Sequence, residues 1–174
     1  MLAEHPDANV DAAAQVAHAV TVHKAAVEDD FFTAVDDLNT RKEDLGSAHM
    51  GNTEFGAGVF YQYVCVNVSA LVANLGGDAA LARTALRALV EACATTSPSG
   101  KRNSFGSHAR ASFMLAERGS QQPRSLVSAF VEPVGQGDVL GAAVNKLKDT
   151  RQRMDKVYGA CTDAAAEFDV GTGT

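Results

Sequence analysis

Two apolar runs separated by a long insert constrain the possible folds more than any other feature of this sequence. The runs cover residues 16–23 and 59–68, and both are rich in valine, which favours strands. The insert, residues 24–58, has charged borders and contains phenylalanines, a methionine and several glycines. Loops longer than about 12–15 residues inside compact domains are usually functional or disordered. We therefore expect an irregular, protruding insert that carries the function and is supported by the rest of the chain.

Residues 59–68 give the clearest strand signal. Alternate positions are apolar on both faces, which predicts a central strand that is covered on both sides. Tyr61 and Tyr63 share one face and could stack on bases, as aromatic side chains do in RNA-recognition motifs. Packing beneath a helix is the commoner outcome for tyrosines in so apolar a strand.

Two amphipathic helices follow from capping and periodicity. Asp78 is the expected N-cap of a helix that extends to about residue 95, and Asp138 caps another that extends to about Tyr158. On the second helix, Val144, Leu147 and Tyr158 fall on the apolar side, which predicts that this side faces the core.

The order of the elements predicts the fold class. The other expected elements are a strand over 16–23, a short helix capped by Ser69, an irregular basic segment over 101–110, a strand over 112–117, a short element over 125–130 and a flexible tail over 160–174. This order predicts one α+β domain, residues 1–174, with a small antiparallel sheet and helices on one face. Its class is ferredoxin-like or RNA-recognition-motif-like, and the abrupt start predicts an incomplete sheet.

The composition is that of an ordinary globular chain. Of its 174 residues 46% are hydrophobic, and the net charge of −6 gives no global indication of nucleic-acid binding. The cysteines Cys65, Cys93 and Cys161 lack CxxC spacing, and the first two occupy apolar positions, which predicts buried thiols in a reducing cytoplasm. Neither a signal-peptide pattern nor an apolar run of about 18 residues is found, so we expect no membrane partner.

The sequence does not indicate catalytic chemistry. The five histidines are scattered, and no nucleophile motif or phosphate-binding loop is recognisable. The acidic pairs at 29–30 and 36–37 could ligate Mg²⁺, but carboxylates at a loop border are usually solvated. We expect no enzyme activity, no metal site and no cofactor. A nuclease that uses the acidic pairs is the weakest alternative.

Two local features fit nucleic acid or a protein partner. Lys101, Arg102 and Arg110 could contact phosphate, although ordinary surface charge accounts for such residues more often. Val35 and Met50 are apolar residues of the protruding insert, which could wedge between bases or contact a partner chain. The alternative is that the insert folds back onto the core.

Several sequence blocks closely resemble one family. They lie at residues 17–23, 32–38, 46–51, 58–77, 99–104 and 125–134. They include the strings His-Ala-Val-Thr-Val-His, Gly-Ser-Ala-His-Met-Gly and Ser-Gly-Lys-Arg-Asn-Ser. In these blocks the chain resembles the CasC family, the backbone subunit of Cascade, the type I-E CRISPR surveillance complex.

The resemblance implies a ferredoxin-like, hand-shaped subunit that polymerises along CRISPR RNA without catalysing a reaction. Its partners would be CRISPR RNA, target DNA through guide pairing, neighbouring copies of itself and other Cascade subunits. The insert 24–58 would be a thumb that folds over the RNA, with Met50 covering a displaced base. The RNA-binding residues that it implies are Met1, Thr33, Val35, Met50, Lys101, Arg102 and Asn103.

Members of the CasC family are considerably longer than this chain, which looks like their carboxyl-terminal half. The sheet would then lack partner strands and expose an edge. The alternative function is a protein-interaction module, or a truncated remnant, that docks on another chain and does not bind RNA by itself.

Overall fold

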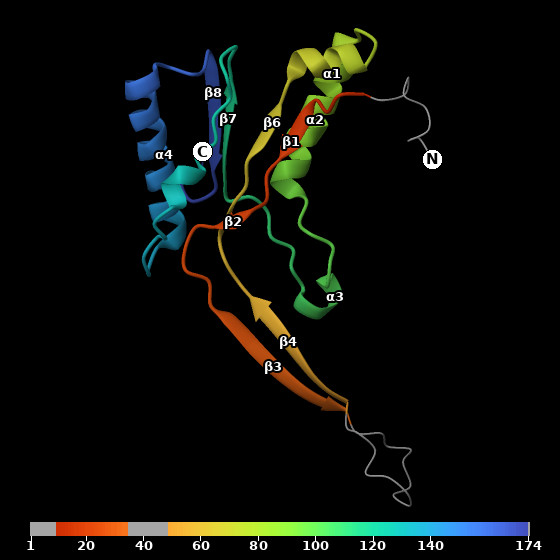
Figure 1. Cartoon of the computed structure of the whole chain (residues 1–174), viewed down its shortest axis with the longest axis vertical. Coiled ribbons are helices and arrows are strands. Elements are labelled where there is room, and N and C mark those ends of the chain that lie inside the picture. The colour runs from red at the N-terminus through yellow and green to blue at the C-terminus, as the bar shows by residue number, and fades with distance from the viewer. Residues whose placement is uncertain (1–9, 35–48, 174) are drawn as a thin grey trace, which may run out of the picture.

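The computed structural model describes residues 10–34 and 49–173 (Figure 1). Its elements, in chain order, are β1 (Ala14–Val16), β2 (Val20–Thr21), β3 (Val27–Ala34), β4 (His49–Gly56), β5 (Phe60–Tyr61), β6 (Val64–Val66), α1 (Val68–Asn74), α2 (Ala79–Thr95), α3 (Arg102–Phe105), β7 (Phe113–Arg118), the 3-10 helix η3 (Val127–Phe130), α4 (Val139–Tyr158) and β8 (Ala164–Asp169). The class is α+β with small antiparallel sheets, as the sequence predicts.

The amino-terminal part of the described chain is one long antiparallel ribbon. β1 pairs with β6, β2 with β5 and β3 with β4, so residues 14–34 run against residues 49–66. Between the first two pairs, three residues (17–19) face two (62–63), which is the one-residue excess of a β-bulge. This irregularity explains why the strands predicted over 16–23 and 59–68 are each interrupted.

The prediction that the insert is irregular is wrong for the residues that the structure describes. β3 and β4 pair over eight residues each, from Val27 opposite Gly56 to Ala34 opposite His49. In Figure 1 this pair, which we call the arm, extends away from the helices. The periodicity of two in residues 27–34 is masked by three consecutive acidic residues, so the local pattern did not indicate a strand.

Local capping signals are confirmed for the two long helices. Asp78 Oδ1 accepts hydrogen bonds from the backbone N–H groups of Ala80 and Leu81 at the start of α2. Asp138 Oδ1 accepts one from Gly141 at the start of α4. α1 begins two residues earlier than expected, because Asn67 rather than Ser69 caps it through the N–H of Ala70.

The prediction of a flexible tail over 160–174 is wrong for residues 164–169. These residues form β8, which pairs along the whole of β7 from Phe113 opposite Asp169 to Arg118 opposite Ala164. Lys148 Nζ on α4 lies 2.6 Å from the Glu167 carboxylate and holds β8 to the helix. Alanine favours helices, so only a partner strand distant in sequence makes this segment extended.

Most of the small core lies where α4 meets η3, with Val22 after β2 and Ala82 on α2 buried elsewhere in the described chain. Its buried apolar residues are Val22, Ala82, Leu126, Ala129, Ala143, Val144 and Leu147. Val144 and Leu147 confirm the predicted inner side of α4, whereas Tyr158 is 75% exposed at the end of the helix. Cys93 is also exposed, against expectation, because nothing described covers that side of α2.

No helix in the described part of the chain is long and apolar enough to cross a membrane.

Candidate nucleic-acid interface

The ribbon is anchored to the rest of the molecule at β2 and β5. The Val134 N–H donates to Val22 O at 2.8 Å, and the Leu126 N–H donates to the Tyr61 hydroxyl at 3.0 Å. The Tyr61 ring also packs on Phe130, with ring centroids 5.4 Å apart. Packing rather than base stacking is therefore the role that the structure gives Tyr61.

Tyr63 lies nearby and is partly withdrawn from solvent. Burial, with a smaller contribution from a hydrogen bond to Cys65, raises the pKa of Tyr63 to about 12. The negative charge of Glu117 on β7 acts in the same direction. The raised pKa of Tyr63 thus reflects the partial burial of its phenol.

A short helix positions the basic block 101–103 beside the arm. It lies at the end of the arm where Val27 pairs with Gly56, which we call proximal; the end at Ala34 and His49 is distal. α3 is bounded by Lys101 (φ 50°) and Gly106 (φ 61°), both left-handed, so the chain turns sharply at each end. The Phe105 ring at the end of α3 lies 6.2 Å from the ring of Phe55 on β4. Lys101 Nζ lies 6.0 Å from the Phe105 ring centroid. The aromatic pair thus seats a basic segment beside the arm.

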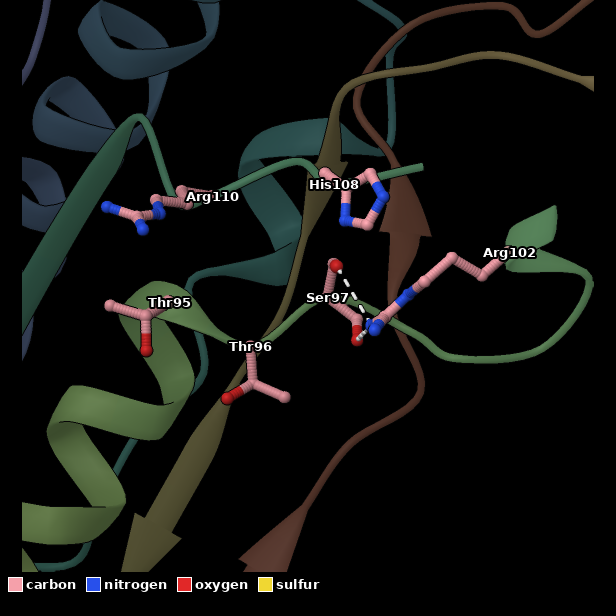
Figure 2. A pocket seen from close by; sticks show the side chains of 6 residues that line it. All are labelled: Thr95, Thr96, Ser97, Arg102, His108 and Arg110. Carbon is pink, nitrogen blue, oxygen red and sulfur yellow. Dashed lines mark hydrogen bonds between the residues drawn. The ribbon is translucent and has the colours of Figure 1, made fainter. Parts of the chain in front are cut away.

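A shallow depression of about 330 Å³ opens between the end of α2, α3 and the segment that leads to β7 (Figure 2). We call it the basic depression; its lining residues are Thr95, Thr96, Ser97, Arg102, His108 and Arg110. It contains two guanidinium groups, an imidazole and three hydroxyls, and no carboxylate. The Thr95 and Ser97 hydroxyls already donate to Glu91 O and Ser107 O, so the guanidinium groups, the imidazole and the Thr96 hydroxyl are the donors that match a phosphate group.

Arg102 shapes the loop beside the basic depression. Its Nη2 donates to Ser97 O at 3.0 Å and Pro98 O at 3.3 Å (Figure 2 draws its bonds to Ser97). Its Nε is buried and has no hydrogen-bond partner in the described part of the chain. In Figure 2, Arg102 and Arg110 lie on opposite sides of the depression. His108 lies between them, across the depression from Thr96. Part of the Arg102 guanidinium therefore holds the loop, and Arg110 is the freer cation.

The predicted RNA-binding residues fall into two places. Thr33 and Met50 are direct cross-strand partners near the distal end of the arm, so the structure brings these two together. Lys101, Arg102 and Asn103 lie at its proximal end, around α3. Met1 and Val35 lie outside the described residues. No contact to RNA is tested for any of the seven, and all remain predictions.

The proximal half of the arm is acidic. Glu28, Asp29 and Asp30 follow one another on β3, and Asp29 lies directly opposite Glu54 on β4. All four residues are exposed. Adjacent strand residues point to opposite faces, so Asp29 and Asp30 cannot share one metal ion. Among the described residues, no group of three His, Cys, Asp or Glu side chains could hold a metal ion.

Sequence reasoning missed the wall formed by Thr95, Thr96 and Ser97, which it took only as the end of a helix. His108 was likewise left among scattered histidines. The signal that could have found them is a run of hydroxyl residues shortly before a basic block, a combination that suits phosphate.

A family model described as CT1975-like protein matches residues 1–172. The chain belongs to the CT1975-like family. Among curated proteins none matches the chain significantly. Solved structures do match, and they confirm the resemblance to a CRISPR-associated family that the sequence blocks indicated.

Two of these structures cover the whole of this chain. A chain of a pre-nicking CRISPR RNA-guided surveillance complex is 38% identical, with a TM-score of 0.84, and 47% of its own length is matched. A chain of another CRISPR RNA-guided surveillance complex is 37% identical, with a TM-score of 0.80, and 68% of its length is matched. The CT1975-like chain described here thus spans about half the length of the first of these relatives.

Proposed function

We propose that the chain is a non-catalytic, RNA-binding subunit of a type I-E Cascade-like surveillance complex. The observation that carries this proposal is the match of the entire chain, at a TM-score of 0.84 and 38% identity, to a chain of a CRISPR RNA-guided surveillance complex. At that identity the likeness extends beyond fold class. The partners we propose are CRISPR RNA, target DNA paired to the guide, further copies of the chain and other subunits.

The basic depression supports a contact to the RNA backbone rather than to base edges. Its donors are cationic or hydroxyl groups around an open surface, and it is too shallow to enclose a base. Backbone contacts give binding independent of sequence, which a subunit that carries arbitrary guides requires. Lys101 and Asn103, both exposed beside it, would extend this contact along the chain of phosphates.

The arm supports the role of a thumb over the RNA. It is a two-stranded projection whose described residues are not buried, as expected for a segment that reaches a partner. Because its proximal half is acidic, phosphate contact there is unfavourable. We therefore propose that the arm meets RNA near Thr33 and Met50, at its distal end, with Val35 and Met1 in the same contact.

The test measures binding of a fluorescent CRISPR guide RNA to the chain and to Lys101→Asn/Arg110→Gln at several salt concentrations. Asparagine tolerates the left-handed backbone at 101, so this change removes charge without strain. We expect at least about tenfold weaker binding and a salt dependence reduced by about one per lost phosphate contact.

The matched control is Arg83→Gln/Arg87→Gln, which removes two charges from the exposed surface of α2 away from the depression. This control should change affinity less than about twofold, since only long-range attraction is lost. Equal loss in both double variants would show that net charge alone matters. Absence of RNA binding by the parent chain at low salt would overturn the proposal in favour of a protein-interaction module.

A further inference from the structure

The arm is joined to the body of the molecule at a break in the ribbon. β2 ends at Thr21 and β3 begins at Val27, whereas β4 ends at Gly56 and β5 begins at Phe60. Residues 22–26, the outgoing side, therefore face only residues 57–59, the returning side, and the regular ladder cannot continue through this joint, which we call the root of the arm. Figure 1 shows that the chain changes direction between β2 and β3. A contact other than regular strand pairing must therefore hold the arm at its root.

His23 bridges the two sides of the root through both nitrogens of its ring. On the returning side, the Val59 N–H donates to His23 Nε2 at 3.1 Å. On the outgoing side, His23 Nδ1 lies 3.0 Å from Lys24 O. Because a carbonyl oxygen can only accept a hydrogen bond, Nδ1 carries the proton and Nε2 is the acceptor. The two partners therefore select the tautomer that is protonated at Nδ1.

The bond from Val59 takes the place of a bond of the backbone ladder. Val59 O accepts from the Val22 N–H at 3.0 Å, so the two backbone groups of Val59 bond to consecutive residues of the outgoing side. In a regular antiparallel pair, the Val59 N–H would donate to a backbone carbonyl of the partner strand. At the root the imidazole of His23 supplies this acceptor, where the unequal lengths of the two sides interrupt the ladder.

The backbone of His23 is itself fixed to the body of the molecule. It forms a parallel bridge with Val134, whose N–H donates to Val22 O at 2.8 Å. Val22, the preceding residue, is 2% exposed and belongs to the core. The body therefore holds the main chain of His23, while the side chain of His23 holds the returning side of the root.

The absence of a side chain at Gly58 leaves room for the ring of His23. A Cβ at Gly58 would lie 3.3 Å from His23 Nε2 and 3.5 Å from Thr21 Cγ2. The first of these distances is tighter than most Cβ contacts, so a side chain at 58 would press on the ring at the atom that accepts the bond from Val59. The root is thus closely fitted around Nε2.

We propose that His23 is the positioning residue of the arm, and that the bond from Val59 to its Nε2 fixes the direction in which the arm leaves the body. His18, the other histidine of the block 17–23, is exposed and makes no hydrogen bond to a described residue. The inference deepens the proposed role of the arm as a thumb, because a clamp over RNA requires a defined direction. Only this consequence for RNA rests on the proposed function.

The test compares two amide side chains at position 23 in the full chain. Glutamine reaches about as far as Nε2 and can accept from the Val59 N–H, whereas asparagine is one methylene shorter and reaches only the position of Nδ1. We expect His23→Asn to speed amide exchange at Val59 about tenfold, and His23→Gln to keep it within about threefold of the parent. His18→Asn is the matched control and should leave this exchange unchanged. The Ala17 amide, which bonds to Tyr63 O farther along the ribbon, is the internal reference.

The direction of the arm is measured as the distance between two spin labels, carried by unnatural amino acids at Asn52 on β4 and Asp149 on α4. Both positions are exposed in the structure. The parent, His18→Asn and His23→Gln should give one narrow distribution of distances, whereas His23→Asn should give a broader or shifted one. Rescue by glutamine separates the acceptor at Nε2 from a general need for a polar side chain at this position.

The inference is overturned if His23→Asn keeps the distance distribution of the parent, or if the asparagine and glutamine variants lose it equally. Fast exchange at Ala17 in His23→Asn would also overturn it, since the role of His23 would then be general stability and not the direction of the arm. A parent chain that does not bind RNA would overturn the proposed function, while the distances in the chain alone would still decide this inference.

Discussion

The arm and the carboxyl-terminal layer, which consists of η3, α4, β7 and β8, are built on opposite principles. The layer buries Ala129, Val144 and Leu147 and joins its helix to its strands by ion pairs. The arm has no buried residue among those whose side chains are described, and it places Asp29 directly opposite Glu54. Apart from the contact of Phe55 with Phe105, the described arm residues gain little from packing, and their charges repel across the strands. The contrast separates the part of the chain that stabilises the fold from the part that we propose contacts RNA.

The largest expected effect tests the burial side of this contrast. Leu147→Ala should lower the free energy of unfolding by about 2–4 kcal/mol, because it leaves a cavity beneath α4. Leu81→Ala, the same change at a position that is 50% exposed, should cost less than about 1 kcal/mol. Urea denaturation of both variants measures the difference. Similar losses would mean that the layer is no better packed than α2.

An intermediate effect concerns the ion pairs of the layer. Arg124 Nη1 lies 2.7 Å from Asp155 Oδ1, and this contact with the guanidinium is the main cause that holds the pKa of Asp155 below the ordinary value of 3.8. Because the folded pKa is lowered, the stabilisation is present above pH 3.8 and is lost as the pH falls through the folded pKa. Asp155→Asn should cost less than about 1 kcal/mol at pH 7.

The pH series supplies the decisive comparison for this pair. The difference in unfolding free energy between the parent and Asp155→Asn should shrink as the pH is lowered below 4. Asp149→Asn, an exposed position on the same helix without a described ion pair, is the control and should show no such trend. A difference that persists unchanged at low pH would show that packing, and not charge, links Asp155 to Arg124.

The smallest expected effect lies in the arm and has the opposite sign. Asp29→Lys replaces repulsion from Glu54 by attraction and should stabilise the arm by a few tenths of a kcal/mol. Asp30→Lys, opposite the neutral Thr53, removes the same charge without that benefit. Amide exchange in β3 and β4 measures both. Equal protection in the two variants would show that the cross-strand contact carries no energy.

Several site residues could be predicted only in part. The block Lys101–Asn103 was recognised by its basic residues and its resemblance to a family, and α3 places it beside the arm. The hydroxyl wall from Thr95 to Ser97 was not, because its role depends on the turn at Lys101 that folds the loop back across the end of α2. Pairing of Thr33 with Met50 follows from strand register, which two residues seventeen positions apart do not encode locally.

The sequence by itself determined the α+β class, the family resemblance and the two long helices, because caps such as Asp78 and Asp138 act within a single turn. Only the tertiary structure decided that the insert is a paired arm and that residues 164–169 are a strand, since in both cases the partner is distant in the chain. It also decided that β6, apolar on both faces, is only partly buried. Local patterns state what a segment prefers to bury, whereas only long-range pairing determines whether the chain provides the cover.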